Sequence, residues 1–148
     1  MLKYKNPALA VDIIIEHENE IVLITRKHEP YKDTYAIPGG FVEYGELVEH
    51  AAIREAYEET KLRIELKEIL GCYSKADRDP RKHVISIVFI ASTNDHTPEG
   101  SDDAKTAQFF PISEINQLNL AFDHKQILQD YIIWKKKGGT YWSTKEKE

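Results

Sequence analysis

The sequence has very little cysteine. Cys72 is the only one among 148 residues, so no disulfide can form within the chain. This usage suits a reducing compartment, and Cys72, which stands in a strand-like run, is expected to be a small core residue. Long apolar runs are missing too, since none approaches the roughly 20 residues that a membrane-spanning helix needs, and no secretory signal pattern is evident. We therefore expect a cytoplasmic protein that does not bind membranes.

A surplus of positive charge is also absent. Lysine and arginine together number 20 against 25 aspartates and glutamates, which gives a net charge of −5. Proteins that bind nucleic acid usually carry a basic surface, so we expect no nucleic-acid partner. Repeats are lacking as well, and the composition, 41% hydrophobic and 30% charged, is that of a globular protein. Residues 1–148 are expected to form a single domain.

One stretch, Gly39 to Leu62, organises the rest of the chain. Two glycines open it as a turn, and the following run without proline or glycine predicts a helix from about Leu47 to Thr60. Near the end of this helix stand three glutamates at the spacing i, i+3 and i+4, so that all three project from one face. They are Glu55, Glu58 and Glu59.

This placement of three glutamates is unfavourable for an isolated helix. Glu55 and Glu59 repel each other by roughly 0.2–0.5 kcal/mol, and anions near a helix C-terminus oppose the helix dipole. A divalent cation would reverse that effect, because Mg²⁺ binds carboxylate oxygens and completes its shell with water and substrate phosphates. The cluster alone leaves two interpretations open, a metal-assisted phosphate site and a solvated acidic face.

The residues around the cluster resemble the Nudix box, the signature of the Nudix hydrolases, G-x5-E-x7-R-E-U-x-E-E-x-G-U with U apolar. The positions in register are Gly40, Glu46, Arg54, Glu55, Ala56, Glu58, Glu59 and Leu62. Lys61 stands where the family has glycine, at the position that takes a left-handed conformation after a helix. Lysine can adopt that conformation at a cost of roughly 1–2 kcal/mol.

The resemblance implies a role for each polar residue of the box. The metal ligands that it implies, for one to three Mg²⁺ or Mn²⁺ ions, are the Gly40 carbonyl, Glu55, Glu58 and Glu59. Arg54 would orient these glutamates, although its i, i+4 spacing from Glu58 also fits a plain surface ion pair. Glu46 would brace the box, and an anion is favoured at a helix N-terminus in any case.

The remaining pattern predicts strands before and after this helix. Apolar and β-branched runs place them at residues 9–15, 21–25, 63–73, 84–91 and 107–112. Apolar residues at helical spacing predict a second helix that Asp123 caps and that runs through Lys135. Strands on both sides of one internal helix indicate an α+β fold, and the resemblance makes it a Nudix-type α/β/α sandwich with a mixed sheet.

The segments that flank the box resemble the ADP-ribose pyrophosphatase branch of the family. The similar segments are residues 31–38, 77–81, 84–86, 102–105 and 121–124. Ala76 and Lys82 depart from this branch, where proline and glycine are expected. The candidate substrate contacts are Arg26, Tyr35, Arg78 and Arg81.

The resemblance implies hydrolysis of a nucleoside diphosphate linked to another moiety, such as ADP-ribose, by an enzyme that is often a homodimer. Other Nudix substrates, nucleoside triphosphates or nucleotide sugars, remain alternatives, and so does a non-catalytic nucleotide sensor on a Nudix fold. Loops as long as residues 92–105 are often functional. The candidates for the general base are Glu55, Glu99, Asp102 and Asp103, with Glu99 slightly favoured in the loop for its reach.

Overall fold

The computed structural model describes residues 4–101 and 103–147. Strands dominate the order of elements, which also includes two α-helices and one short 3₁₀ helix. In chain order they are β1 (Ala8–His17), β2 (Glu20–Arg26), β3 (Tyr35–Ala36), β4 (Gly39–Phe41), α1 (Val48–Thr60), β5 (Glu65–Tyr73), β6 (Val84–Ser92), β7 (Ala104–Pro111), η1 (Ile112–Gln117), α2 (His124–Lys137) and β8 (Tyr141–Trp142).

The sheet is mixed, with β1 at its centre. The strand order is β3-β2-β1-β6-β5-β8, with β4 paired to β1 and β7 paired to β2. β1 runs parallel to β6 along its whole length and antiparallel to its other partners. The first half of β1 pairs with β4, whereas only its last residues pair with β2. Beyond the hairpin, β2 therefore separates from β1, and β4 takes its place beside the first half of β1.

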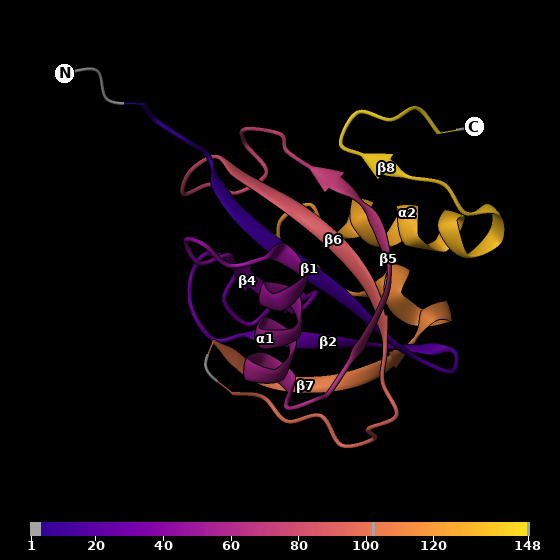
Figure 1. Ribbon diagram of the computed structural model, residues 1–148. Helices are drawn as coiled ribbons and strands as arrows, with labels where there is room; N and C mark the ends of the chain where they lie inside the picture. Colours follow the sequence, from indigo (N-terminus) through magenta and orange to yellow (C-terminus); the bar gives the residue numbers. More distant parts are fainter. Residues whose placement is uncertain (1–3, 102, 148) are drawn as a thin grey trace.

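Strand β1 sends alternate side chains into two separate cores. Val11, Ile13 and Ile15 pack with the small alanines of α1, whereas Ile14 belongs to the core that α2 covers. This alternation is the two-residue period of a strand. Figure 1 shows α1 over one face of the sheet and α2 beyond the other. The arrangement is a sandwich with a helix on each side of a mixed sheet, as the sequence predicts.

Helix α1 agrees closely with the predicted helix. It begins after Leu47 and ends at Thr60, and Lys61 follows in the left-handed conformation with φ 62° and ψ 15°. The Lys61 amide donates to the Tyr57 carbonyl and so closes the last turn. Lysine thus occupies the position where the Nudix box has glycine, in the conformation that the box requires.

Three details differ from the sequence-based predictions, and the tail adds an element for which no prediction was made. The two glycines at 39 and 40 lie in strand β4, paired with Asp12 and Val11, and not in a turn. Cys72 is exposed, because it faces outward from β5. Asp123 occupies the N-cap position of α2 without a side-chain capping bond. The tail adds strand β8 beside β5. None of the described helices has the length and apolar character that crossing a membrane requires.

Candidate active site

Arg54 connects the loop before α1 with the acidic face of that helix. Its Nε and Nη2 donate to the two Glu46 oxygens at 2.8 and 2.9 Å, a bidentate pair. Its Nη1 donates to Glu55 at 2.7 Å and to Glu58 at 3.2 Å, and Nη2 also reaches the Phe41 carbonyl at 3.1 Å. One guanidinium therefore orients three carboxylates and fixes the end of β4.

The pair with Arg54 changes the acidity of Glu46. Hydrogen bonds from the Arg54 guanidinium, together with one from the Glu43 amide, lower the pKa of Glu46 to about 2. The bond to Glu46 in turn raises the pKa of Arg54 above its usual value. Glu46 is therefore ionised under all ordinary conditions and acts as a fixed anchor for the arginine.

Glu59 is buried to an unusual degree for a glutamate, with only 6% of its surface exposed. Its Oε1 accepts a hydrogen bond from the Gly39 amide at 2.8 Å. Burial raises the pKa of Glu59 to about 8, because the single amide bond does not replace the lost hydration. A buried carboxylate with so little compensation is stabilised by a cation in its vicinity.

Glu55 lies directly against the backbone of β4. A Cβ atom on Gly40 would stand 2.2 Å from its Oε2, so a side chain at position 40 would displace the carboxylate. Burial raises the pKa of Glu55, and its hydrogen bond with Arg54 only partly offsets this. Position 40 requires glycine for close approach, and the Gly40 backbone thereby lies next to the Glu55 carboxylate.

The carboxylates of α1 suit a divalent metal ion in donor type. Among the described residues no three acidic, histidine or cysteine side chains converge closely enough to form a complete site. Glu55 and Glu58 instead share the Arg54 guanidinium. Hard cations take few carboxylates and fill the remaining positions with water and phosphate oxygens. Glu55 and Glu59 both have raised pKa values. Such a cation would offset the negative charge of these two carboxylates.

A cavity of about 560 Å³ opens beside these carboxylates. Glu55, Glu59 and Asp103 contribute carboxyl groups to its lining, and Arg26 and Arg81 contribute guanidinium groups. Phe122 lies between the two arginines, with its ring centroid 4.8 Å from the Arg26 guanidinium carbon and 5.9 Å from that of Arg81. The cavity thus has an acidic wall, to which α1 contributes, and a basic wall, to which β2 and the loop after β5 contribute.

Two further arginine–aspartate pairs shape the basic wall. Arg78 donates twice to Asp123, at 2.9 and 2.7 Å, and only 5% of its side chain is exposed. Arg81 donates to Asp79 in the same bidentate way, at 3.1 and 2.8 Å, yet stays 45% exposed. Arg81 is therefore accessible to a ligand, whereas Arg78 mainly fixes the loop after β5 to the start of α2.

Comparison with known proteins identifies the family. The family model described as NUDIX domain matches residues 6–131. The chain belongs to the Nudix hydrolase family. The ADP-ribose pyrophosphatase of Methanocaldococcus jannaschii is 53% identical over 132 residues, which cover 89% of this chain and 77% of that protein.

Two solved structures resemble this Nudix fold along most of the chain. A NUDIX hydrolase from Nitrosomonas europaea superposes with a TM-score of 0.84 at 27% identity, covering 97% of this chain and 80% of that one. The NUDIX domain of Shewanella oneidensis NrtR, solved in complex with ADP ribose, gives a TM-score of 0.77 at 23% identity, with coverages of 88% and 89%. The latter likeness shows the fold alone. The predicted α+β Nudix fold is confirmed.

The predicted site residues of this Nudix hydrolase fall into two groups. Those that line the cavity are Arg26, Gly40, Arg54, Glu55, Glu59, Arg78, Arg81 and Asp103. Glu58 is 42% exposed and is held by Arg54. Tyr35, which is half-buried, packs edge-on against Phe110 beside the core that α2 covers, with ring centroids 5.0 Å apart. The structure thus places Tyr35 against this core and outside the cavity lining, and it brings the box and the loop after β5 together.

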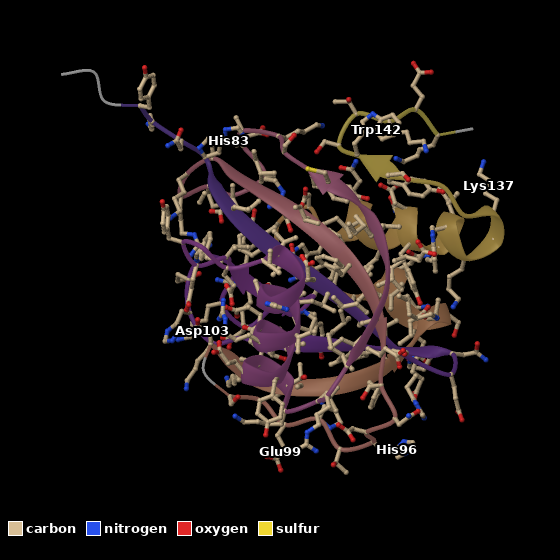
Figure 2. All side chains as sticks on the ribbon, in the orientation of Figure 1. His83, His96, Glu99, Asp103, Lys137 and Trp142 are labelled. Atoms are coloured by element: carbon tan, nitrogen blue, oxygen red, sulfur yellow. The ribbon has the colours of Figure 1, made fainter. Side chains whose placement is uncertain are left out.

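The loop before β7 separates the other candidates for the base. Figure 2 shows the Glu99 side chain at the lower edge of the view, away from Asp103 at the left. The Glu99 amide donates to the Thr60 carbonyl, and Ser101 Oγ donates to the Glu58 carbonyl, so the loop is fixed to the end of α1. Asp103 lies at the cavity, 3.7 Å from His28. Asp102 lies outside the described residues.

The sequence interpretation overlooked several residues of the cavity. Asp12, Asp79, Phe122 and His124 all line it. Asp12 had a visible signal, because it is the one charged residue within the apolar run of β1. Phe122 and His124 lie in the segment 121–124, whose resemblance to the ADP-ribose pyrophosphatase branch was a signal, but only the fold places this segment at the cavity.

Proposed function

We propose that this Nudix hydrolase cleaves the pyrophosphate bond of ADP-ribose to give AMP and ribose 5-phosphate. The observation that carries the proposal is that one cavity brings the carboxyl groups of Glu55 and Glu59 on α1 together with the guanidinium groups of Arg26 and Arg81. A diphosphate bound between them would meet cations from both sides. The 53% identity to an ADP-ribose pyrophosphatase supports ADP-ribose as the molecule that contains this diphosphate.

The acidic wall is the proposed metal site. Glu55, Glu58, Glu59 and the Gly40 carbonyl would hold Mg²⁺ or Mn²⁺. When bound, such ions neutralise developing phosphoryl charge and lower the pKa of an attacking water. Arg54 is the proposed positioning residue, because its bonds to Glu46 and to Glu55 set the direction of the ligand carboxylates.

The basic wall is the proposed phosphate contact. Arg26, the last residue of β2, and Arg81, in the loop after β5, both face Phe122 and remain partly exposed, so either is available to bond to phosphate oxygens. Guanidinium groups suit this task because they bind phosphate through two parallel hydrogen bonds. Arg78, paired with Asp123, is proposed to hold the shape of this wall.

Asp103 is the proposed proton acceptor. It lines the cavity that Glu55 and Glu59 also line, and its charge contributes to raising the pKa values of both. Glu55 is a less suitable base, because a carboxylate that coordinates a cation loses basicity to it. Glu99 would serve only if the loop moved toward the cavity. Asp102 remains a candidate on its sequence position.

A substrate panel with product identification tests the proposal. ADP-ribose is expected to give the highest kcat/KM among ADP-ribose, ATP, GTP, NADH and sugar nucleotides, with AMP and ribose 5-phosphate as products. Excess chelator is expected to abolish turnover, and Mg²⁺ or Mn²⁺ to restore it. A preference for a triphosphate would reject the substrate, and binding of nucleotide without turnover in the presence of metal would favour the sensor.

A homodimer and a cytoplasmic location remain proposals that rest on the family resemblance and on the sequence. Sedimentation velocity across a range of protein concentrations tests the dimer. A sedimentation coefficient that stays at the value for 17.1 kDa at all concentrations would reject it.

A further inference from the structure

A buried polar group that the proposed mechanism does not use lies at the floor of the cavity. Asp12, on β1, is 9% exposed and lines the cavity together with His124, the first residue of α2. Ser86, fully buried on β6, donates from Oγ to Asp12 Oδ2 at 2.5 Å. This bond fixes the carboxylate and leaves its other oxygen, Oδ1, directed away from Ser86.

The imidazole of His124 is fixed as well. The Ile37 amide donates to Nδ1 at 3.0 Å, which makes Nδ1 an acceptor and places the imidazole proton on Nε2. Burial lowers the pKa of His124, in agreement with a neutral ring. The Nε2–H group is then a donor whose orientation is set by the backbone of the segment between β3 and β4.

The donor and the acceptor face each other but do not bond. His124 Nε2 and Asp12 Oδ1 are 3.8 Å apart, which exceeds the length of a hydrogen bond. A single oxygen at about 2.8 Å from each atom fits between them, with an angle of roughly 85° at that oxygen. A hydroxyl group meets both needs at once, because its proton goes to the carboxylate and its lone pair accepts from the imidazole.

Phosphate does not fit this position. The charge of the Asp12 carboxylate contributes to raising the pKa of Glu59. A phosphate oxygen against Oδ1 would add repulsion between two anions. Gly39 also lies against the carboxylate, since a Cβ atom there would stand 2.4 Å from Oδ1, so the neighbouring strand β4 covers one side of this oxygen.

We propose that Asp12 and His124 form a specificity subsite that binds a sugar hydroxyl of the substrate through Asp12 Oδ1 and His124 Nε2. The inference rests on the proposed function, because it assigns this pair to a ribose of the nucleoside diphosphate. ADP-ribose has two riboses, and the chemistry of recognition is the same for both. The subsite therefore discriminates ribose from deoxyribose at one position, as sites with buried polar groups do.

The test combines protein variants with substrate analogues. Asp12→Asn keeps the bond from Ser86 but replaces the acceptor Oδ1 by a donor. His124→Asn keeps an acceptor for the Ile37 amide but removes the Nε2–H donor. Asp77→Asn is the matched control, because Asp77 is exposed and lies outside the cavity lining. The substrates are ADP-ribose and a series of its monodeoxy analogues that lack one hydroxyl on either ribose.

Both cavity variants are expected to lower kcat/KM for ADP-ribose roughly 10- to 100-fold, and the control to leave it within about twofold. For the one analogue that lacks the bound hydroxyl, wild type and variants should be nearly equal, and this analogue tells which ribose the pair binds. Equal losses on every analogue would overturn the proposal in favour of a purely structural pair, and so would no loss on any substrate.

Failure of the proposed function would give a different experimental result from failure of the subsite proposal. Wild-type protein that leaves ADP-ribose intact but cleaves another sugar-linked nucleoside diphosphate rejects ADP-ribose alone, and the same variants are then assayed with deoxy analogues of that substrate. If Asp12→Asn fails to fold, as judged by circular dichroism, the His124→Asn variant decides. If both fail to fold, the pair is structural and the proposal is overturned.

Discussion

Arg54 and Glu46 form a bidentate ion pair that joins the loop after β4 to the middle of α1, with N–O distances of 2.8 and 2.9 Å. The same guanidinium bonds to Glu55, which lies against Gly40. Glu46 holds the guanidinium through Nε and Nη2. The remaining group, Nη1, therefore determines where the carboxylates of α1 point. The orientation of the proposed metal ligands therefore depends on Glu46, which lies eight positions before Arg54 in the chain.

Arg54→Lys is expected to lower kcat roughly 10- to 100-fold and to weaken metal activation. Lysine keeps the charge, but its single ammonium group cannot bond to Glu46, Glu55 and the Phe41 carbonyl at the same time. The measurement is kcat as a function of Mg²⁺ concentration. Arg63→Lys, at an exposed position after α1, is the control. Unchanged metal activation in Arg54→Lys would show that the arginine only forms a surface ion pair.

Glu59→Gln is expected to abolish most turnover while stabilising the metal-free protein by on the order of 1–3 kcal/mol. The folded-state pKa of about 8 lies above the unfolded value near 4.5, so the folded protein retains a proton that the unfolded chain releases. Wild-type stability in chelator should therefore fall as pH rises from about 4.5 to about 8. Urea unfolding at pH 5 and pH 8 measures this.

The same experiment has an internal control. Saturating Mg²⁺ should remove the advantage of Glu59→Gln, because wild-type protein then gains binding free energy that the variant lacks. A variant that shows the same difference in stability at both pH values would contradict the raised pKa. One that keeps near wild-type kcat would exclude Glu59 as a ligand.

Glu16, on the other side of the sheet, is expected to give folding stability the opposite dependence on pH. Burial alone would raise its pKa, but hydrogen bonds from Lys135, Tyr131 and Lys67 outweigh it, so the pKa lies below its usual value. This network therefore contributes stability above about pH 4.5 that is lost as pH falls further. Glu16→Gln should destabilise the protein by roughly 3 kcal/mol at pH 7.

The loss in Glu16→Gln should shrink below pH 4.5, as wild-type Glu16 itself becomes protonated. Thermal unfolding between pH 3 and pH 7 measures the difference in stability. Glu18→Gln, in the exposed turn between β1 and β2, provides a control that should change stability by less than about 0.5 kcal/mol. A constant difference at all pH values would show that the network depends on packing and not on charge.

Asp103→Asn is expected to lower kcat by roughly 100-fold or more with little change in unfolding temperature, since Asp103 is exposed and lines the cavity. Glu99→Gln, in the same loop, should retain near wild-type kcat because Glu99 is not among the residues that line the cavity. Steady-state kinetics of both variants, with Asp102→Asn alongside, measures this. The reverse ranking would mean that the loop closes on the substrate and brings Glu99 to the phosphates.

The sequence by itself determined the helix of the Nudix box and the residues that this helix presents. The spacing of Glu55, Glu58 and Glu59 needs only the helical period, and the left-handed Lys61 follows from the box register. The apolar strands were predictable for the same reason, because their alternation is local. What depends on residues within a few positions of one another can be inferred without the fold.

Only the tertiary structure decided which charged residues meet in the cavity. Arg78 is held by Asp123, 45 residues away, and this pairing leaves Arg81 as the more exposed of the two arginines. Asp12 on β1 and His124 at the start of α2 come within 3.8 Å of each other only in the folded protein. Side-chain burial and pairing between distant segments arise from strand register and helix packing, and no local period in the sequence encodes them.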